Sequence, residues 1–155
     1  MTDLDSTGNT GELKRITRFF NHKKSKYVFI VLDDERILDY IITTIQVEQE
    51  KKGKKILKLR LNLNNEENKF SVYYQVKEYL EHTGGRDIDG LIVTGMNTLI
   101  YTEPRLTIDL LNRSRDAFER FGLPIAFILN TDNLRKLIHG APDFYQLRET
   151  SSFHI

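Results

Sequence analysis

Residues 111–137 constrain the fold more than any other part of the chain. Their sequence, LNRSRDAFERFGLPIAFILNTDNLRKL, is typical of the end of an amphipathic helix, a tight turn at 122–124, a buried strand and a polar loop that opens a new helix. The same alternation of helical and extended segments repeats upstream. Because the connections are too long for hairpins, they indicate crossovers between parallel strands.

Four apolar runs have the length of β-strands. The run at 27–32 is continuous, which is typical of a central strand that is buried on both faces. The second run alternates with Lys58 and Arg60, which favours a position at or near a sheet edge. The four runs cover 27–32, 56–61, 90–94 and 125–129. We expect the following side chains to be nearly free of solvent contact: Val28, Ile30, Ile92, Phe127 and Leu129.

Segments with apolar residues at helical spacing lie between and around these runs. They cover 11–21, 37–52, 69–83, 104–121 and 131–138, and a last strand is possible at Phe153–Ile155. Right-handed crossovers place helices on both faces of a parallel sheet. We therefore expect one α/β domain over 11–155, preceded by a disordered tail over 1–10. Its architecture should be a three-layer α/β/α sandwich with a mainly parallel sheet of four to five strands and an extra N-terminal helix.

The composition narrows the classes of protein. The 155 residues fit one domain, and 23 basic against 22 acidic residues give a net charge of +1, so a nucleic-acid partner is not expected. The absence of cysteine excludes disulfides, thiol catalysis and cysteine-ligated metals. No apolar run approaches the roughly 18 residues of a membrane span, and the N-terminus lacks the pattern of a secretory signal. A cytoplasmic protein without a membrane partner is the expectation.

Ligands of doubly wound sheets bind beyond the carboxyl ends of the strands. Four predicted loops meet that description: 33–35, 62–65, 95–97 and 130–133. Their polar side chains define a candidate site edge, which consists of Asp33, Asp34, Asn97, Asn130 and Asp132. The histidines are scattered and no serine has a nucleophile context, so we expect no catalytic residue, cofactor or metal ligand.

The first of these loops is where a phosphate-binding fold would have its glycine-rich motif. A P-loop needs G-x-x-x-x-G-K-[ST], because glycines let backbone N–H groups surround a phosphate and lysine adds charge. The loop here reads LDDERIL, with no Gly, Lys, Ser or Thr, and the dinucleotide fingerprint is missing as well. ATP hydrolysis by the usual route is therefore not expected. Asp33 and Asp34 suit either the start of a helix or a Mg²⁺ site.

The segment VFIVLDDERILDYI resembles the start of a response-regulator receiver domain, in which a strand ends in paired acids that hold Mg²⁺. The resemblance covers one strand–helix unit. Where the receiver has its phosphoacceptor Asp, this chain has 94–97, TGMN. Thr131 suits the receiver's Thr or Ser, but the expected Lys has no counterpart. The resemblance implies a receiver-like fold without phosphotransfer.

A longer resemblance covers about fifty residues of the C-terminal half. The pattern L-N-x-x-R-[DE], then G-x-P before a strand, then A-P-D-[FL]-[WY], resembles AAA+- or STAND-like domains of bacterial signalling proteins, which are often linked to tetratricopeptide repeats. The matching residues are Asn112, Arg115, Asp116, Gly122, Pro124, Ala141, Pro142, Asp143, Phe144, Tyr145 and Arg148. The acids that such folds carry after the third strand are missing. The resemblance therefore implies a degenerate NTPase fold that serves as a recognition or docking module.

The sequence also contains a candidate interaction surface. Four apolar residues lie on one face of the predicted N-terminal helix: Leu13, Ile16, Phe19 and Phe20. This stripe either packs on the sheet's own layers or contacts another chain, and we expect it to contribute to a homo- or hetero-oligomeric contact. Tyr74 is expected to be exposed and suited to a protein contact. The alternative function is a nucleotide- or Mg²⁺-dependent enzyme, or a receiver-like regulatory domain, that uses Asp33 and Asp34.

Overall fold

The computed structural model describes residues 9–21, 26–83, 87–148 and 152–155. In chain order, its elements are α2 (Asn9–Phe20), β1 (Tyr27–Val31), η1 (Glu35–Ile37), α3 (Leu38–Glu50), β2 (Ile56–Arg60), α4 (Val72–His82), β3 (Gly90–Thr94), α5 (Met96–Thr102), α6 (Pro104–Arg113), η2 (Arg115–Phe121), β4 (Ile125–Leu129), α7 (Thr131–Gly140), α8 (Pro142–Gln146) and β5 (Phe153–His154). Most of the tail predicted over 1–10 lies outside the described residues, and its last two residues belong to α2.

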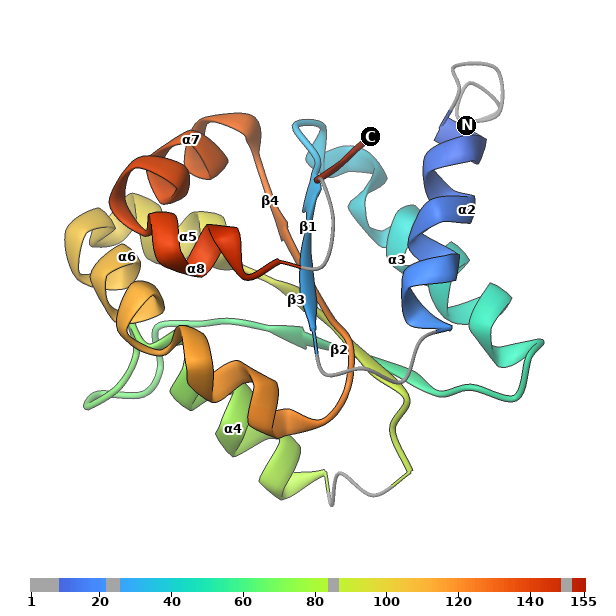
Figure 1. Ribbon diagram of the computed structural model, residues 1–155, viewed down its shortest axis with the longest axis horizontal. Helices are drawn as coiled ribbons and strands as arrows, with labels where there is room; N and C mark the ends of the chain where they lie inside the picture. Colours follow the sequence, from blue (N-terminus) through green and yellow to red (C-terminus); the bar gives the residue numbers. More distant parts are fainter. Residues whose placement is uncertain (1–8, 22–25, 84–86, 149–151) are drawn as a thin grey trace.

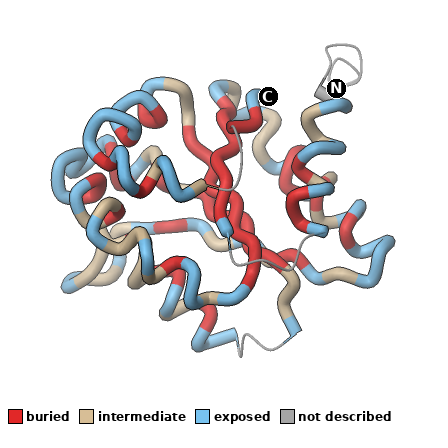
Figure 2. The backbone as a smooth tube through the Cα atoms, in the orientation of Figure 1, coloured by how far each residue is buried: buried red, intermediate tan, exposed pale blue. Residues whose placement is uncertain are grey.

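The five strands form one sheet in the order β2-β3-β4-β1-β5. Every neighbouring pair is parallel. Helices cover both faces (Figure 1), so the predicted three-layer α/β sandwich is confirmed. The five strand residues that were expected to be solvent-free are each 0% exposed. Figure 2 shows this buried sheet through the middle of the molecule.

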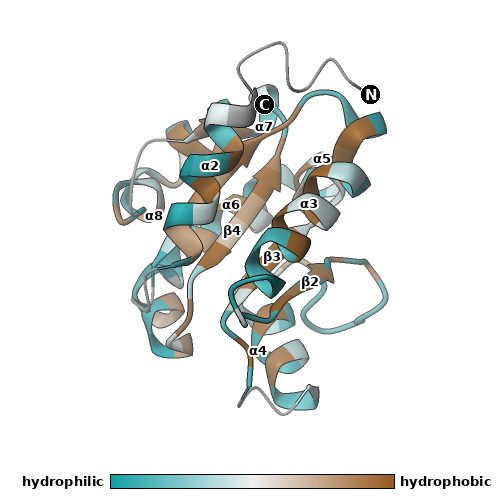
Figure 3. Ribbon diagram, turned by 90° about the vertical axis from the view of Figure 1, so that its right-hand side faces the viewer, coloured by the Kyte–Doolittle hydropathy of each residue, from teal (hydrophilic) through white to brown (hydrophobic). Residues whose placement is uncertain are grey.

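The layer formed by α2 and α3 covers one face of the sheet. Ile16, Phe19 and Phe20 are buried there among strand residues, and Leu13 packs against the same cluster. Gly90 makes room for the stripe, since a Cβ at this position would lie 2.7 Å from a ring carbon of Phe20. Ile16, Phe19 and Phe20 are therefore core of this chain, which is the first of the two outcomes that the stripe allows. A contribution of α2 to an oligomeric contact stays a prediction. Figure 3 shows α2 and α3 in front of the apolar strands.

The opposite face carries α4 to α8 and an aromatic core. Tyr27 lies at its centre, with its ring stacked on Phe144 at 4.6 Å and edge-on to Phe118 at 5.9 Å. Phe29 and Phe127 add further ring contacts from the adjacent central strands. Aromatic pairs in these geometries contribute about 0.5–1.5 kcal/mol each beyond their burial. The two faces of the sheet therefore differ in composition, because the strand residues that face α2 and α3 are mostly aliphatic.

Two helical predictions need correction. The helix predicted over 104–121 is interrupted at Ser114, whose hydroxyl donates to the carbonyl of Leu110 at 2.8 Å, and the chain continues as the 3-10 helix η2. The loop predicted at 95–97 instead begins α5. Gly95 has φ of +91° and a Cβ there would lie 2.5 Å from the carbonyl oxygen of Leu61, so only glycine fits this turn.

The two sheet edges are both contacted by side chains. At β2, the carbonyl of Ile56 accepts from Gln46 Nε2 at 2.9 Å and that of Lys58 accepts from the Tyr79 hydroxyl at 3.0 Å. At β5, the backbone N–H of His154 donates to the Glu12 carboxylate at 3.0 Å. Among the described residues, no helix is both long and apolar enough to cross a membrane.

Candidate functional site

The crossovers locate the point of the sheet where a ligand is expected. The chain leaves β1 towards α3 on the aliphatic face, whereas it leaves β4 towards α7 on the aromatic face. β1 and β4 are neighbours, so their carboxyl ends flank a topological switch point (Figure 1). Open α/β sheets bind ligands in the crevice at this place.

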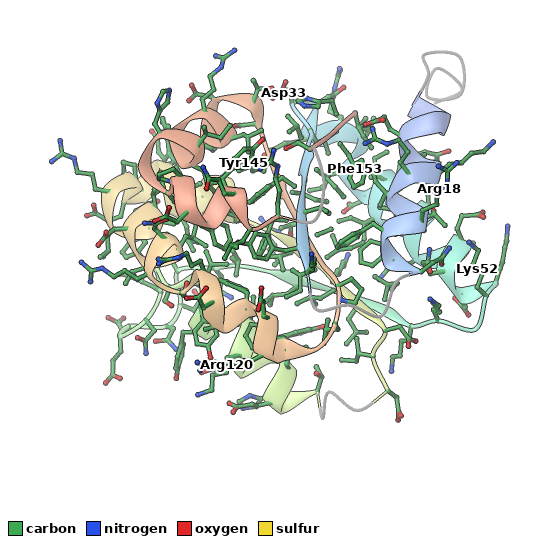
Figure 4. All side chains as sticks on the ribbon, viewed as in Figure 1. Arg18, Asp33, Lys52, Arg120, Tyr145 and Phe153 are labelled. Carbon is green, nitrogen blue, oxygen red and sulfur yellow. The ribbon has the colours of Figure 1, made fainter. Side chains whose placement is uncertain are left out.

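A carboxylate of the chain itself lies at this crevice. Asp33, directly beyond β1, accepts hydrogen bonds of 2.7 Å from both the backbone N–H and the hydroxyl of Thr131, the first residue of α7. These donors hold the pKa of the Asp33 carboxyl below its usual value, because they stabilise its charged form. Figure 4 shows Asp33 at the top of β1. The negative charge that the N-terminus of a helix favours is therefore supplied by the chain itself.

Three asparagines extend this network to β3. Asn97 Oδ1 accepts from the backbone N–H of Asn130 at 3.1 Å and from Nδ2 of Asn133 at 2.7 Å. Asn130 Oδ1 in turn accepts from the backbone N–H of Asn133 at 2.8 Å, as a helix N-cap. We call the group of Asp33, Asn97, Asn130, Thr131 and Asn133 the clasp, because it joins the exits of β1, β3 and β4.

The other predicted edge residues lie outside the clasp. Asp34 caps η1 and accepts from the backbone N–H and the Nε of Arg36 at 3.0 and 2.9 Å. These contacts with Arg36 lower the pKa of the Asp34 carboxyl. Asp132 forms an exposed ion pair of 3.4 Å with Lys136 on its own helix. Within the described ranges, no group of three His, Asp or Glu side chains is arranged to hold a metal ion.

A cleft of about 360 Å³ lies beside the clasp, between α3 and the carboxyl ends of β2 and β3. Lys58 and Arg60 line it from β2, and Glu35 and Asp39 line it from η1 and the first turn of α3. We call it the charged cleft. Sequence reasoning missed it, because the alternation of Lys58 and Arg60 in an edge strand indicates only a solvent-facing side.

Residues of the C-terminal resemblance form contacts at and near α8. Asn112 Oδ1 accepts from the backbone N–H of Phe144 at 3.1 Å, and Arg115 donates to the carbonyl of Asn112 at 2.9 Å. The guanidinium of Arg148 lies 3.7 Å above the Tyr145 ring. Figure 4 shows Tyr145 on α8. The residues of this pattern that make these contacts therefore have a structural role.

Exposed apolar side chains are found away from the predicted interaction residues. Tyr74 is half-buried rather than exposed, and its contact with another protein stays a prediction. Tyr101 at the end of α5 is 85% exposed, and Leu106 in the first turn of α6 is 45% exposed. Aromatic residues are enriched in the cores of protein interfaces. This α5–α6 corner is therefore a better candidate contact surface than α2.

Comparison with known proteins does not assign the chain to a family. It matches none of the protein-family models, curated proteins or solved structures with which it was compared. The inference of function therefore depends on the geometry described above.

Proposed function

We propose that this chain is a non-catalytic protein-interaction module of a cytoplasmic bacterial signalling or defence system, built on an NTPase-like fold without a phosphate-binding loop. The observation that carries the proposal is the pair of hydrogen bonds from Thr131 to Asp33. They place a carboxylate at the N-terminus of α7, in the crevice where such a fold would hold phosphates. A nucleotide would have to displace Asp33 and lie among acidic residues.

The strand order bears on the receiver resemblance. Read from β5, the order is 5-1-4-3-2, with β1 between β4 and β5. It differs from the 2-1-3-4-5 order of the receiver domain, so the receiver resemblance stays limited to the first strand–helix unit.

The partner in this proposal is another protein or a second copy of the chain, and its contact is the α5–α6 corner. Tyr101 offers a large exposed ring there, and Leu106 adds an apolar neighbour. Both lie outside the two buried clusters of the core. Their replacement should therefore change binding without unfolding the domain.

The absence of nucleotide binding is tested by thermal unfolding with ATP or GTP and Mg²⁺ in large excess. We expect no shift, whereas a ligand at a hundred times its dissociation constant would stabilise the fold by about 2.7 kcal/mol. A nucleotide-dependent shift or turnover that is lost in Asp33→Ala or Asp34→Ala would support the Mg²⁺-dependent enzyme instead.

The interaction is tested with a Tyr101→Ser, Leu106→Ser double variant. The wild type should capture a defined partner from the host or sediment as an oligomer, and the double variant should lose that contact while it keeps its melting temperature. Val47→Ser is the matched control, because Val47 is 43% exposed on the opposite layer. Equal behaviour of all three proteins would contradict the proposed surface.

A further inference from the structure

The charged cleft has walls of opposite charge. Lys58 and Arg60 project from the same face of β2, because alternate residues of a strand point in the same direction. Glu35 and Asp39 contribute carboxylates from η1 and the start of α3. The cleft therefore presents cationic groups from the strand and anionic groups from the helical segment.

These charges have no ion-pair partners among the residues that the structure describes. In the described part of the chain, some exposed charges elsewhere form ion pairs, for example Arg113 with Asp109 at 2.8 Å. None of the four cleft side chains forms an ion pair or a hydrogen bond through its charged group to any residue that the structure describes. Their charges are therefore available to a ligand. This contrasts with the clasp nearby, whose polar side chains bond to one another.

The floor of the cleft combines apolar and polar groups. Leu32, Ile42 and Ile128 are buried and line its base. Thr94, which is 8% exposed, also lines it, and its hydroxyl has no hydrogen-bond partner among the described residues. Small-molecule sites typically join an apolar lining with a few convergent polar groups. A ligand could place hydrocarbon on the floor and hydrogen-bond the Thr94 hydroxyl.

We propose that the charged cleft binds a small zwitterion of amino-acid or dipeptide size. A carboxylate on the ligand pairs with Lys58 and Arg60, and an ammonium pairs with Glu35 and Asp39. The volume of about 360 Å³ lies at the lower end of ligand pockets, roughly 300–1,000 Å³, and limits the ligand to this size class. A simple anion would meet the carboxylates and a simple cation would meet the basic wall, so neither fits as well.

The location agrees with this assignment and is independent of the proposed interaction function. The cleft opens at the carboxyl ends of the parallel strands, where α/β sheets bind their ligands. It does not require displacement of Asp33, since its lining does not include the clasp pair of Asp33 and Thr131. Loss of a protein partner would leave this inference untouched, and failure of the zwitterion to bind would leave the α5–α6 contact untouched.

The test is a binding screen with the twenty free amino acids and a set of dipeptides. Thermal unfolding identifies stabilising compounds, and calorimetry then gives the dissociation constant. At least one zwitterion should bind in a saturable way. Its methyl ester, which lacks the negative charge, and its N-acetyl derivative, which lacks the positive charge, should each bind at least tenfold more weakly.

Variants locate the binding. Arg60→Gln and Asp39→Asn should each weaken binding at least tenfold, because each removes one charge from one wall. Arg18→Gln and Glu81→Gln are the matched controls, since both residues are exposed on other helices and should leave the affinity unchanged. The unliganded melting temperature of each variant verifies that it folds. The proposal is overturned if no zwitterion binds, or if binding survives both cleft variants.

Discussion

The carboxyl edge of the sheet has two halves, which differ in whether their polar and charged side chains bond to one another. Beyond β1 and β4, the Asp33 carboxylate is held by donors of Thr131, and the neighbouring asparagines bond to one another. Beside β2 and β3, Lys58 and Asp39 line an open cleft without pairing. Both halves are polar in the sequence, so polarity alone does not distinguish a closed edge from an open one. The pairing of the groups does.

This difference indicates which half stabilises the fold and which half is available to a ligand. A polar group that already has its partners gains little from a ligand, because binding must first break the internal bonds. A group without partners can contribute its full interaction to a ligand. We therefore assign the β1–β4 half to the integrity of the fold and the β2–β3 half to recognition.

The largest expected difference between the halves lies in the strands beneath them. Ile30→Ala in β1 should lower the free energy of unfolding by about 2–5 kcal/mol, because the side chain is 0% exposed and its loss leaves a cavity. Leu59→Ala in β2 should cost clearly less, since that residue is only partly buried. Urea denaturation measures both. Equal losses would show that β2 is as central as β1.

A smaller effect is expected at the clasp. Asn130→Ala removes the N-cap acceptor of α7 and should lower the free energy of unfolding by about 1 kcal/mol. Thr98→Ala on the cleft side is the comparison, because Thr98 is exposed, and it should change stability by less than about 0.5 kcal/mol. The same denaturation measurement checks both. An Asn130→Ala variant with an unchanged free energy of unfolding would show that the clasp does not stabilise the fold.

The clasp should also depend on pH. The pKa of Asp33 is lowered in the folded state, mainly by the Thr131 hydrogen bonds, so its stabilising contribution is present above the ordinary carboxyl pKa of about 3.9 and is lost as pH falls below it. The stability difference between wild type and Asp33→Asn should therefore shrink between about pH 5 and the acid limit of folding. In a Thr131→Val background this pH dependence should be weaker. A difference that stays constant with pH would contradict the role of the carboxylate.

The smallest effect is expected in the charged cleft without ligand. Lys58→Met and Asp39→Asn should each change the free energy of unfolding by no more than about 0.5 kcal/mol, because neither charge forms an ion pair with a residue that the structure describes. Chemical denaturation of the two variants checks this. A loss comparable to that of Asn130→Ala would place these charges in the structural half as well.

Much of the fold could be predicted from the sequence because its signals are local. Continuous apolar runs such as 125–129 indicate buried strands, and the alternation at Lys58 and Arg60 indicates an edge. The interruption of the long helix at Ser114 could not be predicted, since an apolar stripe continues through it. An apolar stripe also does not state what it packs against, so the pattern of α2 alone is compatible with burial on its own sheet and with contact with another chain.

The candidate site depends on contacts that no local pattern encodes. Asp33 and Thr131 are 98 residues apart, and their pairing follows only from the position of β4 beside β1. The sequence did place Asp33, Asn97 and Asn130 at one edge, because the carboxyl ends of parallel strands share an edge. It could not show that they bond within one network, or that Lys58 and Arg60 face a cleft.

The outer edge of β2 limits how this protein can bind other proteins. The outward carbonyls of Ile56 and Lys58 already accept hydrogen bonds from Gln46 and Tyr79. An incoming strand would find these acceptors occupied, and recognition by β-strand addition needs them free. The same side chains protect this edge of the sheet against edge-to-edge aggregation. Replacement of both Gln46 and Tyr79 by Ala would expose a template for strand exchange between copies.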